Sequence, residues 1–341
     1  MLSRAAILAL AIAGVTAVPA RATLVYDRGN LKSTVWVAGD DGSHPRRLAV
    51  GEFPRISPDG KLVAYEVIGD SRNYRPDLML IPADGSAPPR LLAKGWRDSF
   101  TFTWSFDSKT IATVLGPELG AKKLALIDVT TGAQRPIASG FFNGVSFSSA
   151  DDALVYGRAT SERYPPHSDV YRVEFSGGAP TRITHDGIST SPLWGPREQI
   201  VFVKLVDAKK RRYGPKNELY LMAPNGSGAR RLTRTNVAPL LFGLTPTSWS
   251  SDGTELLTEF GGQDTSYAET VDPRTGGGRV LTNLSKTNFI GAALSHDGRT
   301  ILGVIGFEGD PPAMHTIVTI PYAGGAPKVL VRAAGDPDWN R

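Results

Sequence analysis

The stretch Arg55-Ile56-Ser57-Pro58-Asp59-Gly60-Lys61-Leu62-Val63-Ala64-Tyr65 contains a tight turn between two apolar segments. Pro58 restricts φ for the turn, the Asp59 side chain can hydrogen-bond to nearby backbone, and Gly60 tolerates a positive φ. Because apolar residues flank this turn on both sides, the stretch predicts a β-hairpin.

Degraded copies of this hairpin recur along the whole chain. Each begins with a large apolar anchor residue, which in most copies precedes a turn containing Ser or Asp. The seven anchors are Ile56, Trp104, Phe147, Trp194, Trp249, Leu294 and Trp339. The differences between their residue numbers run from 43 to 55. A strand-rich repeat of this period is typical of the blades of a β-propeller.

The repeat predicts an all-β fold, a seven-bladed β-propeller of four-stranded antiparallel blades. The first unit begins in mid-blade, because Leu24-Val25-Tyr26 matches the second hairpin strand Val63-Ala64-Tyr65. The last anchor, Trp339, has only the innermost-strand half of the unit. We therefore expect the N- and C-terminal strands to share one blade, which would close the ring and remove two open sheet edges.

Two further features of the repeat predict structure rather than ligand binding. A cation begins every predicted fourth strand, where it would discourage edge-to-edge pairing of the outermost strand. These cations are Arg47, Arg90, Arg135, Arg182, Arg231, Arg279 and Lys328. The four anchor tryptophans are expected to pack between blades.

The N-terminal segment has the pattern of a signal peptide. Arg4 supplies a positive charge, residues 5–18 are apolar, and Ala20-Arg21-Ala22 is a small-residue cleavage site. The apolar run is shorter than the ~20 residues that span a bilayer, although an uncleaved membrane anchor is the alternative. The sequence predicts a signal peptide over 1–22 and a single propeller domain over 23–341. The mature protein would be periplasmic or secreted, without stable membrane insertion.

Composition narrows the possible partners. The chain has 341 residues, no Cys and a formal net charge of +5. Without Cys, neither a disulfide nor a lipid-modified N-terminal Cys can form. The charge is too mild to indicate nucleic-acid binding, and the expected export argues further against it. We expect a monomer.

The segments Ser57–Tyr65 and Leu219–Thr233, together with the repeat period, resemble the TolB-type β-propeller repeat. The resemblance covers essentially the whole expected mature chain and implies the propeller fold. TolB is a periplasmic protein that carries a small α/β domain and takes part in Tol–Pal assembly. Prolyl-oligopeptidase-like peptidases carry a hydrolase domain beside the same kind of propeller. Neither accompanying domain is expected in this chain, so the resemblance does not imply either activity.

No catalytic constellation is recognisable. A nucleophilic serine needs a base and an orienting carboxylate, and no G-x-S-x-G elbow occurs. The five histidines share no metal-ligand spacing such as H-x-x-x-H, and no glycine-rich segment matches a phosphate-binding loop. The recurring hairpin aspartates are expected to form turns. The sequence therefore predicts no catalytic residue, no metal and no cofactor.

Propeller topology places the remaining polar loops on one face. Loops between second and third strands share this long-loop face with the connections between blades, opposite the short hairpin turns. A rim mixing Arg with Tyr and Phe has the composition of a protein-binding surface; alternatively, the loops are solvated and the phenylalanines fill the tunnel. The candidate binding residues are Arg72, Tyr74, Arg75, Phe142, Arg163, Tyr164, His167, Lys209, Lys210, Arg211, Arg212 and Tyr213.

The sequence favours an exported, non-catalytic binding or scaffold protein of the bacterial envelope, with a protein, peptide or glycan as partner. A carbohydrate-active enzyme is the alternative, because some TolB-like propellers resemble oligogalacturonate lyases that use His and a metal at the tunnel mouth. Only His167 and His185 lie near the relevant face, and neither aligns with a lyase motif. A sensory or regulatory module that supports another envelope complex is a third possibility.

Overall fold

The structure is a computed structural model and describes residues 23–29, 32–68, 76–94, 102–116, 120–161, 163–209, 211, 214–262, 266–281, 288–307 and 310–340. These residues form 27 β-strands and one 3-10 helix, η1 (Pro312–Met314). In this part of the chain no helix has the length and apolar character needed to span a membrane. The all-β prediction is confirmed. The predicted signal peptide, residues 1–22, lies outside the described residues.

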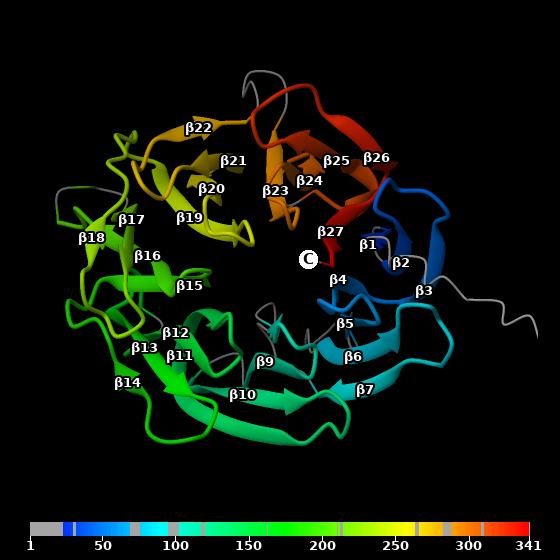
Figure 1. The fold of residues 1–341 in the computed structure, drawn as a ribbon, viewed down its shortest axis with the longest axis horizontal. Helices are drawn as coiled ribbons and strands as arrows, with labels where there is room; N and C mark the ends of the chain where they lie inside the picture. Colours follow the sequence, from blue (N-terminus) through cyan, green and yellow to red (C-terminus); the bar gives the residue numbers. More distant parts are fainter. Residues whose placement is uncertain are drawn as a thin grey trace, which may run out of the picture.

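The strands form seven four-stranded antiparallel groups around a central axis, and each group is one blade of a propeller (Figure 1). From the innermost strand outward, blade 1 consists of β27(Gly335–Trp339), β1(Thr23–Arg28), β2(Thr34–Gly39) and β3(Arg46–Val50). Blade 2 consists of β4(Glu52–Ile56), β5(Leu62–Ile68), β6(Pro76–Pro82) and β7(Arg90–Ala93). Blade 3 consists of β8(Phe102–Trp104), β9(Thr110–Leu115), β10(Lys122–Asp128) and the first half of β11(Gln134–Phe147). Blades 4 and 5 are the second half of β11, β12(Ala153–Ala159), β13(Ser168–Glu174), β14(Thr181–Arg182); and β15(Ser189–Gly195), β16(Gln199–Val206), β17(Lys216–Met222), β18(Arg230–Arg231). Blades 6 and 7 are β19(Leu241–Trp249), β20(Leu256–Gly262), β21(Ser266–Val271), β22(Gly278–Val280); and β23(Phe289–Leu294), β24(Thr300–Ile305), β25(Thr316–Pro321), β26(Lys328–Arg332). Their number agrees with the seven blades predicted.

One strand belongs to two blades. Residues 134–140 of β11 pair with β10, and residues 141–147 pair with β12. Gly140, at the junction, has φ +151°, which lies in the region that favours glycine. The sequence predicts a fourth strand and an innermost strand here; the structure joins them into one continuous strand of 14 residues.

The two ends of the chain close the ring. β27 pairs antiparallel with β1, with Leu24 opposite Trp339 and Val25 opposite Asp338. Figure 1 shows the C-terminal strand lying beside the first N-terminal strand. The predicted blade of mixed N- and C-terminal strands is confirmed.

The repeated hairpin is held by one Ser–Asp arrangement. The Ser57 hydroxyl donates to the Asp59 carboxylate (2.7 Å) and accepts from the Leu62 N–H (3.0 Å), while Gly60 has φ +73°. The same Ser–Asp contact occurs in Ser105–Asp107, Ser250–Asp252 and Ser295–Asp297. These aspartates form turns, as the sequence predicts.

Apolar clusters fill the spaces between adjacent blades. Val25 of blade 1, for example, packs in one cluster with Ile56 of blade 2. Trp339 is buried and donates its indole N–H to the Leu294 carbonyl of blade 7 (3.2 Å). The other anchor tryptophans are buried as well: Trp104, Trp194 and Trp249. Their predicted packing role is confirmed.

Arginines on the outermost strands also connect neighbouring blades. In four blades, an arginine on the fourth strand donates to a carbonyl in the third-to-fourth turn of the next blade. The pairs are Arg46–Ala83, Arg90–Val129, Arg135–Phe175 and Arg230–Pro273. In blades 1 and 5 the connecting residue is the neighbour of the predicted cation. The sequence identified the cations at the edge but not their partners in the next blade.

Candidate functional site at the tunnel mouth

A cavity of about 1250 Å³ lies inside the ring. Its walls include residues from the innermost strands of all seven blades. Hairpin turns, such as the one containing Asp59, line one end. At the other end the lining includes Pro311 and Pro312 of a second-to-third-strand loop, so this end opens on the long-loop face. We call this end the acidic mouth and define it by Asp27, Glu52, Arg55, Asp310, His315 and Asp336.

The cavity is acidic although the chain as a whole is basic. Among the described residues that line it are eight carboxylic acids, whereas Arg55 is the sole Lys or Arg. The acids are Asp27, Glu52, Asp59, Asp107, Glu259, Asp310, Asp336 and Asp338. The net charge of the chain is +5. A concave surface lined by one sign of charge attracts ligands of the opposite sign.

Ring closure assembles the acidic mouth. Asp27 lies at the end of β1, and Asp336 lies on β27, the C-terminal strand that pairs with β1. Glu52 and Arg55 come from β4, and the Phe53 N–H of the same strand donates to Asp27 Oδ2 (3.2 Å). Residues from the two ends of the chain therefore face one opening.

Several carboxylate oxygens at this mouth are buried without a donor. Asp27 is 1 % exposed, and its Oδ1 accepts no hydrogen bond from any described residue; the same is true of Glu52 Oε1. Glu66 on β5 lies opposite Glu52 in the strand register and is also 1 % exposed. Neither of its oxygens has a donor within the described part of the chain. Buried carboxylates in native proteins are nearly always hydrogen-bonded, so this group calls for an explanation.

The same environment raises the pKa of these carboxyl groups. Burial raises the pKa of Glu66 to about 8, with Glu52 adding to the rise and Arg55 opposing it. Burial, followed by the charge of Asp336, raises the pKa of Asp27 and of Glu52. Burial also raises the pKa of Asp336, and this rise is opposed by the charges of Arg55 and His315 and by a side-chain hydrogen bond with Asp27. The mouth therefore holds more carboxyl groups than its own cations neutralise.

Two innermost strands are bulged at the mouth. Phe53 has φ +52° and Asp336 has φ +46°, each directly before a proline, where an extended conformation is preferred. The pairing register shifts beside both residues. A bulge changes the direction of a side chain, and both residues line the cavity.

Six of the twelve binding residues predicted from the sequence lie outside the described residues: Arg72, Tyr74, Arg75, Lys210, Arg212 and Tyr213. The structure brings two of the others together. Partial burial raises the pKa of Tyr164, and the positive charge of Arg211 opposes this rise. The Tyr164 ring also lies over Gly214, so the long loops of blades 4 and 5 meet on this face.

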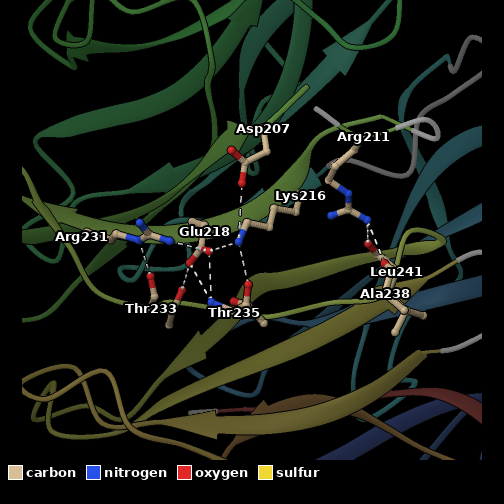
Figure 2. Close-up of polar contacts among 9 residues, drawn as sticks. All are labelled: Asp207, Arg211, Lys216, Glu218, Arg231, Thr233, Thr235, Ala238 and Leu241. Atoms are coloured by element: carbon tan, nitrogen blue, oxygen red, sulfur yellow. Dashed lines mark hydrogen bonds and ion pairs between the residues drawn. The ribbon is translucent and has the colours of Figure 1, made fainter. Parts of the chain in front are cut away.

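Arg211 has a structural role. Its Nη2 donates to the carbonyls of Ala238, Pro239 and Leu241 at 2.9, 2.8 and 2.7 Å. Figure 2 shows this guanidinium turned toward the segment that leads into β19. Because these contacts join two blades, replacement of Arg211 is expected to change stability as well as any binding.

The remaining predicted residues differ in exposure. Arg163, His167 and Lys209 are exposed on the long-loop face. Phe142 is half-buried and packs edge-to-face against Tyr156, with ring centroids 5.6 Å apart. The roles of these residues in binding stay predictions.

The histidines occupy the turns, loops and strand end that the sequence indicated. The expectation that only His167 and His185 lie near the long-loop face is wrong, because His315 lines the acidic mouth. His44 and His296 are in turns, His167 and His185 are in loops, and His315 directly precedes β25. In the ranges that the structure describes, no group of three or more His, Cys, Asp or Glu side chains is placed to hold a metal ion.

Sequence reasoning missed the acidic mouth, although a signal was present. Aligning Leu24-Val25-Tyr26 with Val63-Ala64-Tyr65 places Asp27 and Glu66 at the same position of consecutive repeats. A carboxylate that continues an otherwise buried apolar strand is unusual, because Asp and Glu are rarely fully buried unless paired. This unusual position could have identified Asp27 and Glu66 as candidate site residues. Their proximity to Asp336 becomes visible only after the ring is closed.

No family model matches the sequence, and no curated protein sequence matches it. Solved structures do resemble it. The β-propeller domain of the Trilobed protease from Pyrococcus furiosus has a TM-score of 0.66 at 14 % identity, over 91 % of this chain and 92 % of that one. TolB from Acinetobacter baumannii has a TM-score of 0.56 at 17 % identity, over 92 % and 81 %. An oligogalacturonate lyase in complex with manganese has a TM-score of 0.61 at 16 % identity, over 92 % and 85 %.

At these identities the similarity shows the fold, which is a TolB-like β-propeller. The same fold occurs in a TolB, in a domain of a protease and in a lyase. A shared fold does not decide between binding and catalysis, because function depends on the site.

Proposed function

We propose that this protein is an exported, non-catalytic binding or scaffold module of the bacterial envelope that holds a protein or peptide partner on its long-loop face. The acidic mouth carries the proposal: among the described residues it holds four of the eight acids that line the cavity, with Arg55 as the only Lys or Arg of the lining. The export pattern over residues 1–22 supports the location. Tyr164, which is 64 % exposed, supplies an aromatic contact of the kind enriched at protein interfaces.

Photo-crosslinking tests which face holds the partner. Benzoylphenylalanine is placed at Tyr164 or Phe307 on the long-loop face, or at Phe106 in a hairpin turn at the opposite end of the tunnel. Phe106 is a matched control because it is an aromatic residue that is 47 % exposed. We expect a defined adduct with one envelope protein from the first two positions only. Adducts from Phe106 alone, or from no position, would contradict the proposal.

A carbohydrate lyase is the rival function, and similarity to an oligogalacturonate lyase is the observation that favours it. The charge of the tunnel opposes it, because a polyanionic sugar would enter a cavity lined by carboxylates. Incubation with oligogalacturonate and Mn²⁺, followed by absorbance of the unsaturated product, separates the two. We expect no turnover above a no-protein control; saturable turnover would establish the rival.

A further inference from the structure

The acidic mouth has acceptors that the described protein groups leave without donors. Asp27 is 99 % buried and lines the cavity, yet its Oδ1 has no donor among the described residues. Glu52 Oε1, in the same lining, is in the same situation. Arg55 does not supply the missing bonds: its Nη1 donates to the carbonyl of Pro54 (2.8 Å), and it forms no ion pair with a described carboxylate. A side-chain hydrogen bond joins Asp27 to Asp336, so these two carboxyl groups can share one proton. Asp27 Oδ1 and Glu52 Oε1 still have no donor among the described residues and can accept one from outside the chain.

Apolar side chains lie beside these acceptors. The loop between β24 and β25 contributes Asp310 and His315 to the cavity lining. The same loop carries Phe307 and Met314, which are 69 % and 65 % exposed. His315 Nε2 lies 3.0 Å from the Phe307 carbonyl oxygen. This contact holds the polar end of the loop, which lines the cavity, next to the exposed Phe307. The acidic mouth thus places the carboxylate acceptors of Asp27 and Glu52 beside the exposed apolar side chains of Phe307 and Met314.

We propose that the acidic mouth binds a basic side chain, arginine or lysine, of a peptide segment whose neighbouring apolar residues contact Phe307 and Met314. The inference rests on the proposed binding function and specifies the chemistry of the partner. A guanidinium suits the site because it presents several donors and is weakly hydrated, so its transfer to a buried carboxylate pair costs less than that of an ammonium. The bound cation would give Asp27 and Glu52 the donors they lack.

Matched peptides test the proposal on the unmodified protein. The probe is a fluorescein-labelled pentapeptide with arginine between two phenylalanines, and the control replaces arginine by citrulline, which has nearly the same shape without the charge. Fluorescence anisotropy gives both affinities. We expect the arginine peptide to bind at least roughly tenfold more tightly, as for a hydrogen bond to a charged group. Equal affinities would overturn the proposal without any variant being made.

Variants locate the binding. Asp27→Asn and Glu52→Gln remove a negative charge with little change of shape, and each should reduce the preference for arginine over citrulline. Asp40→Asn is the control, because Asp40 is exposed in a third-to-fourth-strand turn on the opposite face. It should leave the preference unchanged. If Asp40→Asn reduces the preference for arginine as much as Asp27→Asn does, the preference reflects the long-range charge of the protein and the proposed site is wrong.

The pH dependence distinguishes binding from a structural effect. The charged groups around the site are Asp27 on β1, Glu52 and Arg55 on β4, Glu66 on β5, Asp336 on β27, and Asp310 and His315 before β25. A cation binds their deprotonated forms, so affinity for the arginine peptide should rise between pH 5.5 and pH 8.5. A flat profile would contradict the proposal. Crosslinking at Tyr164 or Phe307 that persists in Asp27→Asn would keep the binding function and reject only the cation site.

Discussion

Two buried glutamates of this propeller have opposite surroundings. Glu218 on β17 is fully buried, and Figure 2 shows its carboxylate among donors from Arg231, Lys216, Thr233 and Thr235. Arg231 Nη2 and Lys216 Nζ lie 2.7 and 3.1 Å from its Oε1, and the Thr233 hydroxyl donates to Oε2 at 3.1 Å. The Thr235 N–H also donates to both oxygens. Glu66 on β5 is as deeply buried and has no donor among the described residues.

This difference indicates that the Glu218 carboxylate stabilises the fold, whereas the charge of the Glu66 carboxylate destabilises it. Glu218 occupies a complete network, so its charge costs little in the folded state. Glu66 and Asp27 lie at or behind the tunnel mouth, where burial and neighbouring carboxyls disfavour their charge. A group kept in an unfavourable environment is typical of a site adapted to a ligand rather than to stability.

The largest expected effect is that of Glu218→Ala. The substitution would leave Lys216 and Arg231 without their shared partner, and removal of one member of a buried ion pair costs about 3–5 kcal/mol. Urea denaturation of the purified variant measures the loss. Glu174→Ala is the control, since Glu174 pairs with Arg172 but its side chain is 44 % exposed, and it should cost less than about 1 kcal/mol. Equal losses would remove the distinction between the two kinds of carboxylate.

Glu66→Gln should act in the opposite direction, and only at high pH. At pH 8.5 the variant no longer carries the buried charge, so it should gain about 2–4 kcal/mol relative to its effect at pH 5.5. Any cost of burying the amide is common to both conditions and cancels in the comparison. Thermal unfolding at the two pH values provides the measurement. A variant equally destabilised at both would show that Glu66 has donors in the folded state.

The unmodified protein should lose stability as pH rises. The pKa of Glu66 is about 8 in the folded state and 4.5 in the reference state, so the folded state binds more protons between these values. The free energy of unfolding therefore falls across this interval, and the stabilising effect of protonation is lost as pH passes the folded pKa. We expect a melting temperature several degrees higher at pH 5.5 than at pH 8.5. A melting temperature that is higher at pH 8.5 than at pH 5.5 would contradict a raised pKa of Glu66 in the folded state.

The smallest effect on stability is expected at the rim. Arg163 and Lys209 are exposed, so the double charge reversal Arg163→Glu/Lys209→Glu should change the free energy of unfolding by less than about 0.5 kcal/mol. It should nevertheless weaken capture of the partner that crosslinks at Tyr164. Arg211 is left intact because it holds three carbonyls. Undiminished capture by the double variant would restrict binding to the tunnel mouth.

The fold could be predicted because its signals are local and repeated. Ser57, Asp59 and Gly60 form one turn within a few residues, and the chain repeats that turn. Even ring closure followed from the sequence, since the N-terminal strands and the Trp339 segment complement each other. The connections made by fourth-strand arginines could not be predicted, because their acceptors are backbone carbonyls with no sequence signature.

The site was harder to predict because it depends on distant segments. Asp27 and Asp336 come from opposite ends of the chain and meet only in the closed ring. The predicted rim was chosen from conspicuous basic loops, yet Arg211 in one of these loops has a structural role. The acidic mouth uses single carboxylates inside strands, which a search for charged runs overlooks.

Proton release during peptide binding tests the central claim most directly. Isothermal titration calorimetry with the arginine peptide at pH 7, repeated in buffers of different ionisation enthalpy, measures the protons exchanged. If a cation occupies the acidic mouth, it lowers the raised pKa values of the carboxyls there and should release roughly half to one proton per peptide. Binding with no proton release, or with proton uptake, would contradict the assignment of the mouth as a cation site.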